Sequence, residues 1–144
     1  MNRLVSIGAI FLICGAIACR SAPSPAAPGK STSSNDHAIA AAYESHSSGL
    51  QVEGEGTVTR LLSDDLQKPR HQRFILQLDS GQTLLVAHNI DLAPRVEGLT
   101  AGDRIQFSGV YEWNDKGGLI HWTHRDPSGK HQAGWLKYRG NVYQ

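Results

Sequence analysis

The fold of this chain is decided by residues 71–88, which read HQRFILQLDSGQTLLVAH. Phe74, Leu76 and Leu78 alternate there with polar or outward-facing neighbours, which is the period of a strand with one buried face. The following residues, 79–82 (DSGQ), have the side chains that favour a tight turn. The chain then runs back as TLLVAH, so this stretch predicts a β-hairpin.

Strand patterns continue on both sides of this hairpin. Residues 52–59 alternate between the two faces of a strand, and Gly54 and Gly56 within them suggest a bend or a bulge. Residues 104–113 carry apolar side chains on one face, and after the NDKGG turn residues 119–123 form a returning strand. The pattern therefore predicts five strands.

The connection between the third and fourth strands, residues 89–98, shows helical spacing around Pro94 and predicts one short helix. This order of elements favours an all-β fold, a small five-stranded OB-like Greek-key barrel, over a sandwich, which would need roughly seven strands. The side chains expected to fill the barrel are Val52, Val58, Phe74, Leu76, Leu84, Val86, Ile105 and Phe107.

The first residues of the chain predict export. Residues 1–18 combine Arg3, an apolar run and small residues at the end, as in a signal peptide, and the run is short for a bilayer crossing of about 20 residues. Cys14 and Cys19 are the cysteines of the chain, and AIAC at its end resembles a bacterial lipobox. We expect Cys19 to be lipidated and to anchor the protein on the periplasmic side of the bacterial envelope. The alternative is ordinary cleavage that leaves Cys19 unmodified.

Composition divides the rest of the chain into three parts. Residues 19–34 are rich in Pro and Ser and predict a disordered tether. Residues 35–48 predict a short helix that begins at the capping side chains of Asn35 and Asp36. Residues 49–144 suffice for one domain, which we expect to be a monomer.

The charges of the domain are balanced. The whole chain has 14 Lys and Arg residues against 13 Asp and Glu residues, with a formal net charge of +1 at pH 7. The electrostatic footprint of a strong nucleic-acid binder is therefore missing.

Four motifs, HQRFIL, VAHNIDLAPR, YEWN-x-KGG and IHWTH-x-DP, together resemble the bacterial domain-of-unknown-function family 3465. They lie between residues 71 and 136 and so cover most of the domain. The resemblance implies one domain and an exported role, and it implies no particular substrate.

Histidines supply the candidate chemistry of the domain. Imidazole ligates transition metals and transfers protons near neutral pH. Residues three apart in a strand point to opposite faces, so His121 and His124 reach one site only if the strand ends or bulges between them. The candidate ligand or zinc residues are His71, His88, Asp91, His121 and His124, and the alternative is that these histidines are structural or solvated.

Two tryptophans supply a second candidate site. Tyr111 and Trp113 share the apolar face of their strand and are expected in the core, whereas Trp122 and Trp135 are the candidates for stacking on a ligand. OB barrels bind oligonucleotides and oligosaccharides on the face of strands two and three. For Trp135, packing over the barrel end is the alternative.

These observations lead to a binding or scaffolding domain that is exported and lipid-anchored at the cell envelope. Two alternatives stay open. One is a metal-assisted hydrolase that acts on a phosphodiester or a glycan through the histidines and Asp91. The other is a purely structural envelope protein.

Overall fold

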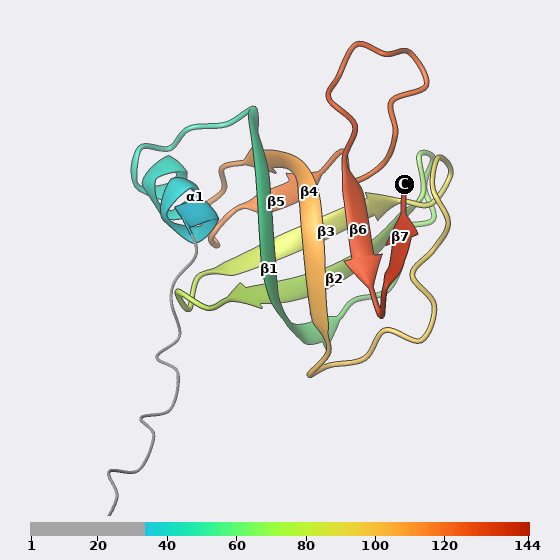
Figure 1. Ribbon diagram of the computed structural model, residues 1–144, viewed down its shortest axis with the longest axis horizontal. Helices are drawn as coiled ribbons and strands as arrows, with labels where there is room; N and C mark the ends of the chain where they lie inside the picture. The colour runs from blue at the N-terminus through green and yellow to red at the C-terminus, as the bar shows by residue number, and fades with distance from the viewer. Residues whose placement is uncertain (1–33) are drawn as a thin grey trace, which may run out of the picture.

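The computed structural model describes residues 34–144, which form a barrel with a helix at one end (Figure 1). The predicted signal peptide, Cys19 and almost all of the predicted tether lie outside the described residues. Within the described part, no helix has the length and apolarity needed to cross a membrane. The elements are α1 (Ser34–Glu44), β1 (Leu50–Leu61), β2 (His71–Leu78), β3 (Thr83–Asn89), β4 (Arg104–Glu112), β5 (Leu119–His121), β6 (Trp135–Tyr138) and β7 (Asn141–Tyr143).

Strand β1 belongs to two sides of the barrel. Its first half pairs antiparallel with β4 and its second half pairs antiparallel with β2. Gly56 pairs with both neighbours, and a Cβ at this position would lie 2.6 Å from the backbone oxygen of Gln77. Glycine therefore allows the close approach at which β1 passes from one partner to the other. A register shift lies between Val58 and Arg60, so the bulge in β1 follows the two glycines at which a bend or a bulge was predicted.

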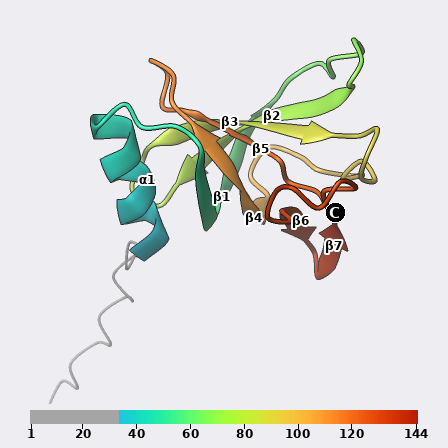
Figure 2. The same cartoon turned by 90° about the horizontal axis from the view of Figure 1, so that it is seen from above.

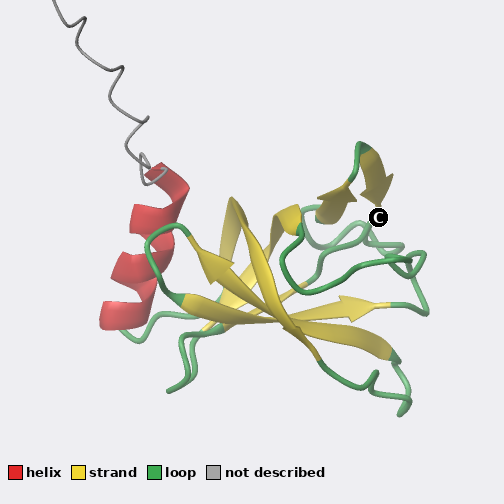
Figure 3. Ribbon diagram, turned by 90° about the horizontal axis from the view of Figure 1, so that it is seen from below, coloured by secondary structure: helices red, strands yellow, loops and turns green. Residues whose placement is uncertain are grey.

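The five predicted strands close into a barrel. β2 and β3 form the predicted antiparallel hairpin, β3 pairs parallel with β5, and β5 pairs antiparallel with β4, which returns to β1. This is the strand order of an OB-like Greek-key barrel, and it confirms the predicted fold class. Figure 3 shows the strands between α1 at one end and a group of loops at the other.

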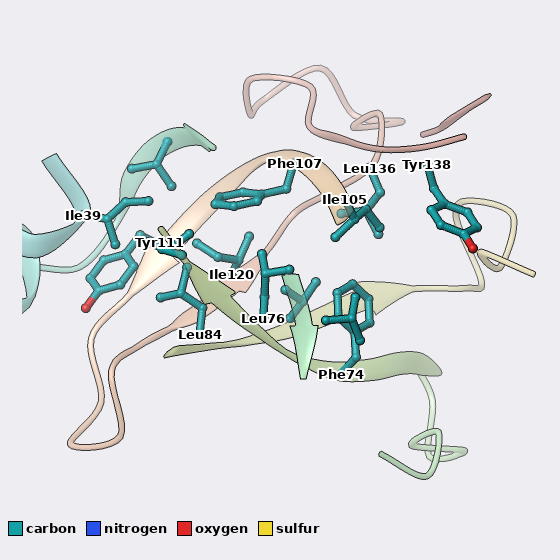
Figure 4. Packing of buried hydrophobic residues seen from close by; sticks show 14 of the residues in the cluster. Ile39, Phe74, Leu76, Leu84, Ile105, Phe107, Tyr111, Ile120, Leu136 and Tyr138 are labelled. Atoms are coloured by element: carbon teal, nitrogen blue, oxygen red, sulfur yellow. The ribbon is translucent and has the colours of Figure 1, made fainter. Parts of the chain in front are cut away.

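The interior of the barrel holds the side chains that the alternation predicts (Figure 4). Phe107 and Tyr111 are fully buried, and Trp113 is partly buried against the same core. The other predicted interior residues are all buried, namely Val52, Val58, Phe74, Leu76, Leu84, Val86 and Ile105. The alternation therefore predicts the correct inner face of β1, β2, β3 and β4.

Helix α1 covers the end of the barrel at the β2–β3 and β4–β5 turns (Figures 1 and 2). Ile39 and Ala42 reach into the core with exposures of 0% and 4%. The helix ends before the predicted residue 48, because Ser47 donates its N–H to the Ala42 carbonyl at 2.9 Å and His46 adopts a φ of 53°.

The helix predicted between β3 and β4 is wrong: residues 90–103 form turns. One helix-like hydrogen bond exists, from Ala93 N–H to the Asn89 carbonyl at 3.1 Å. Pro94 has no N–H to continue it, and the Asn89 side chain accepts the N–H groups of Asp91 and Leu92 at 2.9 and 3.2 Å. The Asn89 side chain thus accepts backbone N–H groups in this connection, where a helix would use main-chain carbonyl groups.

A C-terminal hairpin extends the sheet beyond the five predicted strands. β6 pairs antiparallel with β4, and β7 pairs antiparallel with β6. Leu136 and Tyr138 alternate inward over only four residues, which is too short a pattern to predict a strand from sequence. Trp135 is therefore part of a paired strand and not of an irregular tail.

Candidate functional site

The closing strand of the barrel is interrupted by an excursion that carries much of the candidate site. β5 and β6 both pair antiparallel with β4, β5 opposite residues 110–112 and β6 opposite residues 106–108. They follow one another along the same edge of β4. Residues 122–134, which we call the arm, leave this line after β5 and return at β6.

Backbone geometry at the two ends of the arm explains how it leaves and returns. Trp122 has a φ of 52°, an unusual value for a bulky residue, and it turns the chain out of the strand. Gly134 donates its N–H to the His124 carbonyl at 2.9 Å. A Cβ at Gly134 would lie 2.5 Å from the Ser108 carbonyl oxygen and would also meet the backbone oxygen of Trp122, so only glycine fits this crossing.

The far part of the arm is organised by one carboxylate. Asp126 accepts hydrogen bonds from the backbone N–H groups of Ser128, Lys130 and His131 at 2.8, 2.6 and 2.8 Å. The Ser128 hydroxyl donates to it as well, and these bonds hold the pKa of Asp126 well below its usual range. The result places the His131 ring on the Trp122 indole, with centroids 4.2 Å apart and planes 28° apart.

A cleft lies where the arm meets the outer face of β2, β3 and β5. Its volume is about 350 Å³ and its surface is mainly apolar. The strand alternation turns His71, Ala87 and His121 outward, on the face opposite the core. We call it the imidazole cleft, and it is lined by Pro69, His71, Ala87, Asn89, Leu92, His121, Trp122 and His124.

His88 lies beneath this cleft, on the inner face of β3, and is fully buried. Its Nε2 is 3.0 Å from the Pro94 carbonyl oxygen, which can only accept, so Nε2 carries the proton. Nδ1 then accepts from the Thr123 hydroxyl at 2.8 Å. Burial lowers the pKa of His88 to about 4. Both ring nitrogens are engaged, so His88 is a structural residue that ties the arm to the β3–β4 connection.

His121 and His124 both line the cleft although they are three residues apart. Residues three apart in a continuous strand would point to opposite faces. Here the strand ends at His121 and Trp122 turns the backbone, so both histidine side chains reach the same cleft. Burial lowers the pKa of His121, and its Nε2 lies 3.4 Å from a Glu112 carboxylate oxygen without hydrogen-bond geometry. His124 is buried, and its Nδ1 lies 2.7 Å from the Arg125 carbonyl oxygen.

Asp91 stands beside the cleft and not in its lining. Arg70 donates its backbone N–H and its Nε to the two carboxylate oxygens of Asp91 at 2.8 and 2.7 Å. These bonds lower the pKa of Asp91. Among residues 34–144, no group of three or more His, Cys, Asp and Glu side chains is arranged to hold a metal ion. The zinc site stays a prediction, and with its ring nitrogens engaged His88 has no free lone pair for it.

The comparisons with known proteins agree with the motifs. The model of the family described as "Protein of unknown function (DUF3465)" matches residues 25–144. The chain belongs to the DUF3465 family. Among curated proteins and solved structures, neither comparison finds a significant match.

Of the two stacking candidates in this DUF3465 protein, Trp122 lines the imidazole cleft and Trp135 does not. Trp135 is half-buried on β6 and borders a separate depression with Asn35 and Glu53. The two tryptophans therefore cannot contact one small ligand through the same cleft.

Sequence reasoning missed the supporting residues of this DUF3465 site. Asp126 begins a DPSG turn, and that turn chemistry was a usable signal for the tip of the arm. His131, Pro69 and Leu92 had no such signal, because their contribution depends on three connections meeting at one end of the barrel (Figure 2).

Proposed function

We propose that this DUF3465 protein is an exported, lipid-anchored protein of the bacterial envelope whose OB-like barrel binds its ligand in the imidazole cleft. One observation carries the proposal. The cleft lies on the outer face of β2 and β3, the face with which OB barrels bind oligosaccharides and oligonucleotides, and the Trp122 indole forms part of its wall.

The architecture of the arm supports a binding role. A φ of 52° at Trp122 is a costly backbone conformation, and such strain persists only where the surrounding structure holds it. Here the Asp126 hydrogen bonds and the stacked His131 ring hold the indole in one position. A side chain fixed in this way loses little further conformational entropy when a ligand packs on it.

Ligand binding at the cleft is tested by titrating the full chain with cellotetraose and with an octamer of thymidine nucleotides. We expect at least one of them to shift the backbone amide resonances of Ala87, His121 and Trp122 in two-dimensional ¹H–¹⁵N spectra. Trp122→Ala should weaken that binding about ten-fold, because it removes the aromatic wall.

Trp135→Ala is the matched control, since it deletes the same side chain outside the cleft and should leave the affinity unchanged. Amide resonance shifts confined to residues near Trp135 would show that the ligand binds outside the imidazole cleft. The absence of shifts with both probes would contradict binding at the cleft.

Lipid anchoring is tested by the intact mass of protein extracted from bacterial membranes. We expect a mature chain that begins at Cys19 and carries the added mass of its acyl chains, because the small residues before Cys19 suit lipoprotein processing. Cys19→Ala should lose this mass and leave the membrane fraction. A mature chain that begins after Cys19, or that begins there without lipid, would exclude the anchor.

A further inference from the structure

The histidines of the imidazole cleft offer hydrogen-bond acceptors. The Arg125 carbonyl can only accept, so the His124 Nδ1 at 2.7 Å from it must carry the proton. In the neutral ring the other nitrogen, Nε2, then has a free lone pair. The local backbone thereby selects the tautomer of His124, and the ring presents an acceptor to a ligand in the cleft.

His121 has the complementary arrangement. Its buried Nε2 lies 3.4 Å from a Glu112 carboxylate oxygen without hydrogen-bond geometry, and the negative charge of that carboxylate favours the proton on Nε2. Nδ1 then keeps the lone pair. In their neutral forms, His121 Nδ1 and His124 Nε2 can each accept a hydrogen bond from a ligand.

The composition of the cleft lining favours a neutral ligand over an anionic one. Among the described residues, no Lys or Arg belongs to its lining. Arg70, beside Pro69, is held by Asp91 at 2.7 Å, and the other basic residues next to lining residues in the sequence, Lys68 and Arg125, are exposed outside the lining. Arg95, in the β3–β4 connection, is held by Asp64 at 3.1 Å. A phosphate backbone would find no Lys or Arg side chain in this lining.

We infer that the ligand of the imidazole cleft is a neutral oligosaccharide. Sugar hydroxyls donate to His124 Nε2 and His121 Nδ1, while the apolar face of a sugar ring packs against Trp122 and Leu92. The mainly apolar lining and its volume of about 350 Å³ suit a short run of sugar rings. This inference rests on the proposed function, because it names the ligand class of the same cleft.

The test compares neutral and anionic ligands on the full chain in a detergent without a sugar headgroup. Cellotetraose, maltotetraose and chitotetraose are each titrated by calorimetry, beside the thymidine octamer. We expect at least one saccharide to bind and the octamer to bind at least ten-fold more weakly. Trp122→Ala should weaken saccharide binding about ten-fold, and Trp135→Ala should not.

A second measurement uses the wild-type chain and therefore does not depend on whether a variant folds. Long-range ¹H–¹⁵N spectra of the histidine rings should show His124 protonated at Nδ1 and His88 protonated at Nε2. The His124 Nε2 resonance should move when the bound saccharide donates to it. A proton on His124 Nε2, or an unmoved resonance under saturating saccharide, would overturn the acceptor role.

The outcomes separate this inference from the function on which it rests. Binding of the octamer at the cleft without any saccharide would overturn the saccharide ligand and keep the cleft as a binding site. Binding of neither class by a folded chain would overturn both. Saccharide binding that is insensitive to Trp122→Ala would also remove the cleft as its location.

Discussion

Phe107→Ala should reduce the free energy of unfolding by about 3–5 kcal/mol. The ring is fully buried in the centre of the barrel, where a Cβ added to Gly54 would approach its Cζ to 2.8 Å. β4 pairs there with β1 on one side and β6 on the other, so neighbouring backbones cannot collapse into the space that the ring leaves. Chemical denaturation of the wild type and the variant measures the difference.

Two further variants serve as controls for the Phe107→Ala measurement. Phe107→Leu keeps most of the volume and should cost clearly less than Phe107→Ala. Lys137→Ala changes an exposed residue on the adjacent strand β6 and should shift stability by less than about 0.5 kcal/mol. An unfolding midpoint of Phe107→Ala close to that of Lys137→Ala would contradict the packing described for β4.

Lowering the pH from 7 to 4 should remove on the order of 3 kcal/mol of stability through His88 alone. The pKa of a histidine in the unfolded chain is about 6.5, whereas burial lowers the pKa of His88 in the folded protein to about 4. Between these two pH values the unfolded chain binds a proton that the folded chain does not. The contribution of His88 is therefore complete above pH 6.5, declines as the pH falls, and is lost near pH 4.

The variant His88→Gln isolates this effect. Glutamine does not titrate and can still donate to the Pro94 carbonyl, so the slope of stability against pH should be shallower than in the wild type between pH 4.5 and 6.5. The pKa of His121 is also lowered and contributes in the same direction, but it does so in both proteins. Carboxylates with lowered pKa values, such as Asp126, act at lower pH. Equal slopes would show that His88 is protonated without cost.

The barrel was predictable because its strands repeat one local rule. Phe74, Leu76 and Leu84 alternate with outward-facing residues over seven or more positions, and burial of one face leaves one workable register. The strand order was expected because the order of elements along the chain is that of the OB fold, in which β3 pairs with β5 and β4 returns to β1. The helix predicted between β3 and β4 was wrong because the helical spacing of its residues is only a local pattern. In the folded protein the Asp91 N–H bonds to the Asn89 side chain, and the Val96 N–H bonds to the side chain of Gln72 on β2.

The imidazole cleft shows where local reasoning ends. The sequence named the histidines and Trp122 as candidates, and their residue types were sufficient for that. Whether they meet depends on the crossing at Gly134 and the turn at Trp122, which bring the arm back over β3 and β5. Such contacts join residues far apart in the chain, and no periodicity within a window of ten residues carries that information.

Alternation, turn chemistry and charge balance are properties of neighbouring residues, and they were enough to establish the export signal as a prediction, the strands, the core and the barrel. The protonation state and the accessibility of a side chain depend on the groups that surround it in the folded protein. The tautomer of His124 depends on the Arg125 carbonyl, the neutrality of His88 depends on its complete burial, and the pairing of Arg70 depends on Asp91 across the barrel end. These features became visible when the chain was folded, because electrostatics and hydrogen bonding act through space and not along the sequence.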